Sequence, residues 1–208
     1  TPELPAGLGA LSATGDAFGA TTWYFAQGVA IASGDTHHTW LLLANPGGAV
    51  VHATVHYLVD SGTAQAFAVD VPAQSRVALY ANERVSGEFS TKVTADAPLV
   101  AEQSVFFAND GYTVPGVATP STVWYLPEGP TGSYLTRLHV YNPGLTAANL
   151  AFTVYSESGQ TQVSARTVGP QATLRIPLAE LSSISGSVGI RLNADTPVVV
   201  QRVSQFAG

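Results

Sequence analysis

The sequence has no cysteine and no methionine, and it is poor in charged residues. The absence of cysteine excludes a disulfide scaffold, a thiolate zinc site and a cysteine nucleophile. Asp, Glu, Lys and Arg make up 11% of the 208 residues, whereas about 25% is usual for soluble domains. Because the hydrophobic fraction is 46%, this shortage of charge indicates a folded chain and not a disordered one.

The few charges are dispersed along the chain. The net charge is −6, and the 8 basic residues form no cluster, so we expect no binding to nucleic acid or anionic lipid. No apolar stretch approaches the roughly 20 residues that a membrane helix requires, and we expect no membrane insertion. The chain opens at Thr1 without a methionine, which we interpret as removal of a leader. This interpretation predicts a secreted or cell-surface protein.

Two copies of one module make up most of the chain. Residues 22–28, Thr-Trp-Tyr-Phe-Ala-Gln-Gly, recur as Val-Trp-Tyr-Leu-Pro-Glu-Gly at residues 123–129, at an offset of 101. An Asn-Pro-Gly turn at residues 45–47 recurs at residues 142–144, at an offset of 97. An Asp-x-Pro sequence at Asp96 recurs at Asp195, at an offset of 99. Such self-similarity predicts that one structural unit occurs twice.

Each copy has the pattern of short strands separated by turn residues. Residues 51–59 alternate between apolar and polar side chains, which is typical of a strand with one buried face. The only helix-like pieces are residues 81–85 and 178–184. We therefore predict an all-β protein with two tandem immunoglobulin-like β-sandwich modules of about seven strands each. The strands expected in the first copy are residues 40–44, 51–59, 66–71, 76–80, 88–94 and 98–107, and those in the second include residues 150–155, 162–168, 173–177, 187–192 and 197–206.

These patterns divide the chain into four parts. Residues 1–20 form an N-terminal arm or linker, 21–110 the first sandwich, 111–122 a linker and 123–208 the second sandwich. The first part partly resembles residues 111–122, with Gly15 and Gly116 at the same offset as the two motif tryptophans. It is either a linker from a preceding unit or an extended arm that packs on something. The apolar residues Leu4, Leu8 and Leu11 would give an arm something to bury.

The paired Trp-Tyr motifs, each followed by an Asn-Pro-Gly turn, resemble a known family. It is a tandem domain of unknown function, of the WYFAEG…NPG repeat type, in large secreted and surface proteins of bacteria. The resemblance covers nearly everything after about residue 19. It implies an extracellular, modular, noncatalytic part and supplies no catalytic residues. The second copy departs from the pattern at Leu126-Pro127 and at residues 137–139, Arg-Leu-His, so it is the more diverged repeat.

Motifs for catalysis or metal binding are scarce. His52 and His56 lie four residues apart in a predicted strand, where they would be roughly 13 Å from each other, too far to share one metal ion. No Gly-x-Ser-x-Gly motif occurs. The acidic residues fall at turn signals, which explains them without a carboxylate pair for glycoside hydrolysis. We therefore expect no metal site, no cofactor and no enzymatic activity.

Aromatic residues are the weak candidates for ligand binding. Trp23 and Trp124, with Tyr112 and Tyr134, could stack on sugar rings if they are exposed. A tryptophan that recurs at the same position of both copies is more often a packing residue.

Three functional classes follow from these observations. We favour a structural module of an extracellular or cell-surface assembly, such as a filament subunit that associates with itself or a neighbouring surface protein by strand addition through the N-terminal arm. An adhesion or carbohydrate-binding module of a secreted protein is the alternative, with a glycan as its ligand. An enzyme is the class with least support.

Overall fold

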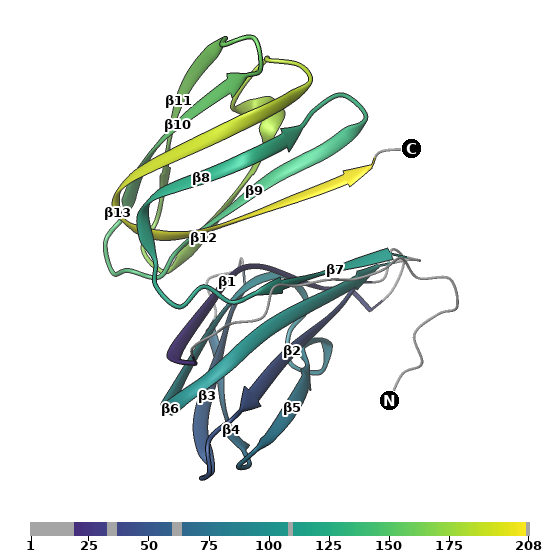
Figure 1. Ribbon diagram of the computed structural model, residues 1–208, viewed down its shortest axis with the longest axis vertical. Helices are drawn as coiled ribbons and strands as arrows, with labels where there is room; N and C mark the ends of the chain where they lie inside the picture. Colours follow the sequence, from purple (N-terminus) through teal and green to yellow (C-terminus); the bar gives the residue numbers. More distant parts are fainter. Residues whose placement is uncertain (1–18, 33–36, 60–63, 108–109, 207–208) are drawn as a thin grey trace. The chain divides into compact units, whose positions relative to one another are not determined.

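The computed structural model describes residues 19–32, 37–59, 64–107 and 110–206. The chain divides into two compact units, Thr1–Thr119 and Pro120–Gly208, and each unit consists of strands with one short 3₁₀ turn (Figure 1). The expectation of an all-β, sandwich-like protein is confirmed. The helix-like pieces are the 3₁₀ turns Ala81–Glu83 and Leu178–Glu180. None of the helices in the described ranges is long and apolar enough to cross a membrane.

Unit 1 is a sheet folded over on itself, so that two strand layers enclose one core. One layer has the order β4-β3-β6-β1 and the other the order β5-β2-β6-β7, and β6 belongs to both. All pairings are antiparallel. The strands are β1 (Ala20–Ala30), β2 (His37–Asn45), β3 (Val51–Val59), β4 (Ala64–Val71), β5 (Ser75–Tyr80), β6 (Gly87–Phe107) and β7 (Asp110–Pro115).

Unit 2 repeats this arrangement with one strand fewer among the described residues. Its layers have the orders β11-β10-β13-β8 and β12-β9-β13, and β13 belongs to both. The strands are β8 (Ser121–Pro130), β9 (Tyr134–Asn142), β10 (Ala148–Ser156), β11 (Thr161–Val168), β12 (Ala172–Pro177) and β13 (Ser187–Phe206). The predicted repeat is therefore a repeat of topology as well as of sequence.

The long strands β6 and β13 join the two layers of their units. In β6, residues up to Ala95 pair with β3, and residues from Val100 onward pair with β2. Pro98 lies between these two sets, where its lack of a backbone N–H costs no ladder hydrogen bond. The sequence analysis placed two separate strands here, at residues 88–94 and 98–107. The Asp-x-Pro sequence instead marks the point at which one continuous strand changes partners.

The strand order differs from that of an immunoglobulin domain. In that fold one sheet has the order ABED and the other CFG. In unit 1 the pairs are nested, because β3 pairs with β4, β2 with β5 and β1 with β6. The long shared strand is what brings the two layers face to face.

A separate hydrophobic core fills each unit. The alternation predicted for β3 places Val51, Ala53, Val55 and Tyr57 inside. The largest side chains that are fully buried are, in unit 1, Trp23, Phe25, Leu41, Leu43, Tyr57, Phe89 and Leu99, and in unit 2, Leu138, Leu150, Phe152, Ile176 and Leu178.

The segment expected to be a linker, residues 111–122, is for the most part folded. β7 occupies its first half and pairs with β6 from Glu102 to Phe107. β8 begins at Ser121, and the boundary between the units falls between Thr119 and Pro120. Pro115 ends β7, and a proline is tolerated at the end of an edge strand. The N-terminal arm, residues 1–20, lies outside the described residues except for its last two.

Candidate assembly site

Residues 102–107 of β6 pair with β7. We call this stretch, and the corresponding residues 202–206 of β13, the strand-addition edges of the two units. In unit 1, β7 pairs along β6 with Tyr112 opposite Val105 and Thr113 opposite Ser104. The Ser104 and Thr113 hydroxyl oxygens are 2.8 Å apart. The strand that completes this sheet therefore comes from the chain segment that leads into the next module.

The inner face of the unit 1 edge holds a buried polar network. Gln103 donates from Nε2 to the backbone oxygen of Gln27, and the Tyr112 hydroxyl donates to Gln27 Oε1. Gln27 and Gln103 are 4% and 0% exposed. Burial raises the pKa of Tyr112 above its usual value. A polar group inside a core is stable only with a partner, so β7 both covers this network and supplies one of its members.

The residues after β7 seal the tryptophan of the first motif. The Gly116 N–H donates to the Ala101 oxygen at 3.0 Å, and Val117 pairs with Tyr24. A Cβ atom on Gly116 would lie 2.7 Å from Trp23 Cε3, so only glycine fits against this ring. Trp23 is 1% exposed. Its Nε1 donates to the oxygen of Leu99 at 2.9 Å, which fixes β1 to the bend of β6.

The same edge in unit 2 differs in its neighbouring strand and in its polar residues. β9 pairs with β13 from Val199 to Phe206, as β2 does with β6. β9 occupies one side of residues 202–206. Within the described ranges, no strand pairs with the other side. Trp124 makes the equivalent hydrogen bond, from Nε1 to the Val198 oxygen at 2.9 Å, but it is only partly buried. Among the described residues, no strand equivalent to β7 lies beside Trp124.

An ion pair replaces the polar network at the unit 2 edge. Glu128 stands where unit 1 has Gln27, and Arg202 stands where it has Gln103. Arg202 donates to the backbone oxygen of Glu128 and lies 3.7 Å from its carboxylate. The Arg202 and Glu128 side chains are 28% and 63% exposed. Each charge has its partner here without a hydroxyl from an added strand.

The aromatic candidates of the sequence analysis are not brought together. Trp23 is buried, so a ligand in solvent cannot reach its ring. Tyr112 lies in the inner face of β7, with its ring 6.2 Å from that of Phe107. Tyr134 is 43% exposed at the start of β9, and Trp124 is partly buried in β8. Leu4, Leu8 and Leu11 lie outside the described residues.

Sequence reasoning did not predict β7 as a strand. The signal that could have found it is the pair of apolar positions Tyr112 and Val114 with Thr113 between them, directly before a glycine that also precedes the first motif. Six residues give a weak alternation, and the flanking glycines and proline outweighed it.

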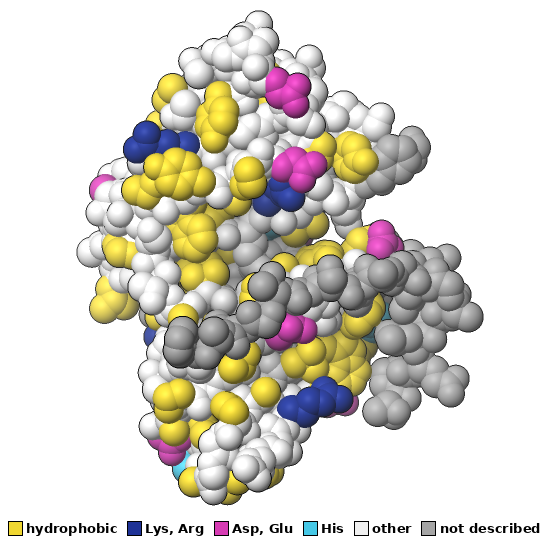
Figure 2. Space-filling view, in the orientation of Figure 1, with side chains coloured by type: hydrophobic (Ala, Val, Ile, Leu, Met, Phe, Trp, Pro, Cys, Tyr) yellow, Lys and Arg dark blue, Asp and Glu magenta, His cyan; other side chains and the backbone are white. Residues whose placement is uncertain are grey.

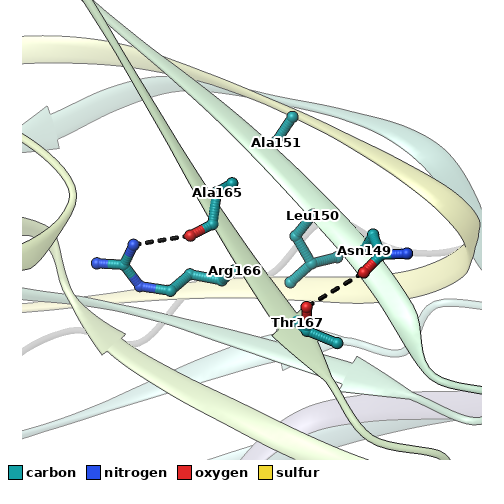
Figure 3. Close-up of a pocket in the computed structure, with 6 residues that line it drawn as sticks. All are labelled: Asn149, Leu150, Ala151, Ala165, Arg166 and Thr167. Atoms are coloured by element: carbon teal, nitrogen blue, oxygen red, sulfur yellow. Dashed lines mark hydrogen bonds between the residues drawn. The ribbon is translucent and has the colours of Figure 1, made fainter.

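No cluster of three or more metal-ligating side chains occurs within the described ranges. The depression in Figure 3 lies over the β10–β11 hairpin, where Thr167 donates to Asn149 Oδ1 at 3.2 Å and Arg166 donates to the Ala165 oxygen at 2.8 Å. Arg166 is the only titratable residue that lines it.

The pKa values of the two histidines of β3 are shifted in opposite directions from 6.5. His52 Nδ1 lies 2.7 Å from Asp70 Oδ1, and this hydrogen bond, with the charges of Asp70 and Asp96, raises the pKa of His52 above 6.5. Burial and the charge of Lys92 lower the pKa of His56. The stabilisation from the His52 pair is present below pH 6.5 and is lost as the pH rises through the folded-state pKa.

NMR titration of the imidazole signals would measure both midpoints. Asp70→Asn should move the midpoint of His52 downward and leave that of His56 in place. Equal midpoints for the two histidines in the unchanged protein would contradict the hydrogen bond.

No family model matches the chain, and no curated protein matches it. Among solved structures, the chain is similar to the crystal structure of Thermotoga maritima 1070, with 18% identity and a TM-score of 0.43 over 48% of this chain and 94% of that one. It is also similar to the Anabaena sensory rhodopsin transducer, with 18% identity and a TM-score of 0.37 over 40% of this chain and 96% of that one. Each similarity spans less than half of this chain, and neither places it in a family.

Proposed function

We propose that this chain is a noncatalytic structural module of an extracellular or cell-surface assembly, and that copies associate by strand addition through the N-terminal arm. The observation that carries the proposal is β7. This segment leads into one module and completes the sheet of the module before it, with pairs from Glu102–Pro115 to Phe107–Asp110. Backbone pairing of this kind gives affinity without a ligand pocket.

The surface of the chain agrees with such a role. Charged side chains are few on the face seen in Figure 2, in line with a charged fraction of 11%. Low charge reduces the repulsion between copies, so contacts between subunits form at lower cost. The tandem arrangement of two similar units also suits an extended assembly, because one kind of contact can recur along it.

The arm can be tested by changing its three leucines. In a variant with Leu4→Asp, Leu8→Asp and Leu11→Asp, we expect filaments or sheets seen by negative-stain electron microscopy to give way to single particles. The charges remove the apolar surface that the arm buries. A variant with Val163→Asp, at a side chain 69% exposed on β11, introduces a charge outside the arm and should still assemble. Unchanged polymers in the triple variant would refute the role of the arm.

A carbohydrate-binding or adhesion module is the second proposal, and exposed aromatic rings in unit 2 favour it. Tyr125 is 64% exposed and Tyr134 is 43% exposed. Flat apolar faces of this kind stack on sugar rings. A signal on a glycan array that falls for Tyr134→Ala or Tyr125→Ala would support this role, and a silent array would count against it.

A further inference from the structure

We propose that the outer face of β8, β13 and β10 in unit 2 binds a disaccharide that carries one carboxylate, with Tyr125 and Tyr155 under the two sugar rings and Arg191 on the carboxylate. This inference rests on the second proposed function, a carbohydrate-binding module, and it names the class of ligand and the residues that hold it. All three residues belong to unit 2 and lie within the described ranges. We call Tyr125, Tyr155 and Arg191 together the tyrosine face.

The pairing of the strands places these three side chains on one face of the sheet. β13 runs between β8 and β10 (Figure 1), and Arg191 lies opposite Tyr125 on one side and opposite Thr153 on the other. Tyr155 is two positions from Thr153 on β10, so it points to the same face. Tyr125 is 64% exposed, Tyr155 is 37% exposed, and Arg191 is exposed. The two tyrosines stand two strand spacings apart, roughly 10 Å, a span that suits two linked pyranose rings.

Gly189 is the reason that the Tyr155 ring lies over the sheet. The two residues pair directly across β10 and β13. A Cβ on Gly189 would lie 2.3 Å from Tyr155 Cε2 and 2.5 Å from its Cζ, so the ring occupies the space that a side chain would fill. A glycine within a strand permits such a close approach. The ring therefore rests on the glycine backbone with its other side toward solvent, as stacking on the apolar C–H face of a sugar requires.

Arg191 supplies a cation between the two rings. Its Cζ lies 5.8 Å from the centre of the Tyr125 ring, within the range of a cation–π interaction. Among the described residues, no carboxylate pairs with Arg191. Asp195 is four residues further along β13, roughly 13 Å away in an extended strand, and it is bonded to Asn149. The guanidinium is therefore available to hold a ligand carboxylate through two parallel hydrogen bonds.

The size and charge of the tyrosine face suit a small ligand with few acidic groups. Three side chains expose far less than the roughly 800 Å² that each partner buries in a stable protein–protein interface. The net charge of the chain is −6, which opposes a long polyanion. Charges beyond about 8 Å are screened at physiological ionic strength, so Arg191 acts on a carboxylate in contact with it. A disaccharide with one acidic ring meets these conditions.

Unit 1 carries half of this arrangement. Tyr24 and Lys92 pair across β1 and β6, with Lys92 Nζ 5.9 Å from the centre of the Tyr24 ring, where unit 2 has its tyrosine and arginine. Leu58 and Ser90 pair across β3 and β6, where unit 2 has a tyrosine over a glycine. Because unit 1 has the same topology without the second ring, the fold does not require it. The second ring and the planar guanidinium distinguish unit 2, and both serve recognition of an acidic sugar.

Two disaccharides that differ in one group test the role of the carboxylate. Cellobiouronic acid has a carboxylate where cellobiose has a hydroxymethyl group. NMR titration of the full chain would follow the amide signals of Gly189 and Arg191 and give a dissociation constant for each sugar. We expect at least about tenfold tighter binding of the acidic sugar, because the charge-assisted pair with Arg191 forms only with it.

Substitutions assign the parts of the site. Arg191→Gln should bring the affinity for cellobiouronic acid down to that for cellobiose. The double variant Tyr155→Leu with Gly189→Ser restores the pair that unit 1 carries, and it should weaken the binding of both sugars at least about tenfold. Leu145→Ala is the control, since this side chain is 81% exposed at the Asn-Pro-Gly turn of unit 2 and outside the tyrosine face. Thermal unfolding of each variant would confirm that its fold is retained.

The other outcomes separate this inference from the function on which it rests. Equal affinities for the two sugars would overturn the inference, while the carbohydrate-binding function would stand. Binding that falls for Tyr134→Ala and not for the double variant would also place the sugar elsewhere. If the signals of the tyrosine face shift on dilution of the protein alone, this face contacts a second copy and the inference fails. If neither sugar binds, the inference fails, and a silent glycan array would then remove the carbohydrate-binding function as well.

Discussion

Asn45→Ala is expected to lower the free energy of unfolding of unit 1 by about 3 kcal/mol. Asn45 is 2% exposed and ends β2 at the Asn-Pro-Gly turn. Its Nδ2 donates to the oxygens of Ala49, Val71 and Pro72 at 2.8, 2.9 and 3.1 Å, and its Oδ1 accepts from the Gly47 N–H at 2.9 Å. Alanine would leave these buried groups without partners.

Chemical denaturation, followed by hydrogen exchange of the amides in β2 and β6, would measure this loss in unit 1. Gly48→Ala is the matched control in the same turn, since no atom lies within 4 Å of the added Cβ. Asn142→Ala should destabilise unit 2 by a smaller amount, because Asn142 Nδ2 donates to two backbone oxygens, those of Thr146 and Gly169. A loss below about 1 kcal/mol for Asn45→Ala would show that water replaces the side chain.

Gly28→Ala is expected to destabilise unit 1 by about 3 kcal/mol. Gly28 pairs with Phe89 across β1 and β6, and the Phe89 ring lies over the glycine. A Cβ on Gly28 would be 2.5 Å from Phe89 Cε2. Phe89 is fully buried and contacts the Tyr57 ring at 5.0 Å between centroids, so it has no room to move. The ring would have to leave its position in the core.

Gly129→Ala is the internal comparison, because Gly129 holds the same place in the second motif. An added Cβ there would be 3.1 Å from Leu178 Cδ2 and 3.2 Å from Ile190 Cδ1. These are the ends of aliphatic side chains, which shift more readily than a buried ring. We expect a loss of about 1 kcal/mol or less in thermal unfolding. Equal losses for the two glycines would contradict the role of Phe89.

Several features of the fold follow from local sequence. The alternation in residues 51–59 predicted β3 with its bounds and its buried face. The Asn-Pro-Gly turns work through contacts between near neighbours, as in the Asn142 hydrogen bonds to Thr146 and Gly144. Such patterns are readable because the interacting groups lie within a few residues of each other.

The strand-addition edge could not be predicted in the same way. The identity of β6 as one strand depends on which partners its two halves meet, and these partners lie 30 or more residues away for β3 and 50 or more for β2. The role of Tyr112 depends on Gln27, which is 85 residues distant in sequence. Similarly, the burial of Trp23 depends on Gly116, which lies outside the first motif.

The sequence by itself determined that the protein is all-β, that it contains one module twice, and where the principal turns lie, because strand periodicity and turn chemistry are local. Only the tertiary structure decided that β7 belongs to the module before it and that the corresponding edge of unit 2 has no added strand within the described residues. Pairing between strands is a contact between distant segments, and a backbone edge carries no side-chain signature of its own. The position of the candidate site is therefore a property of the fold and not of any motif.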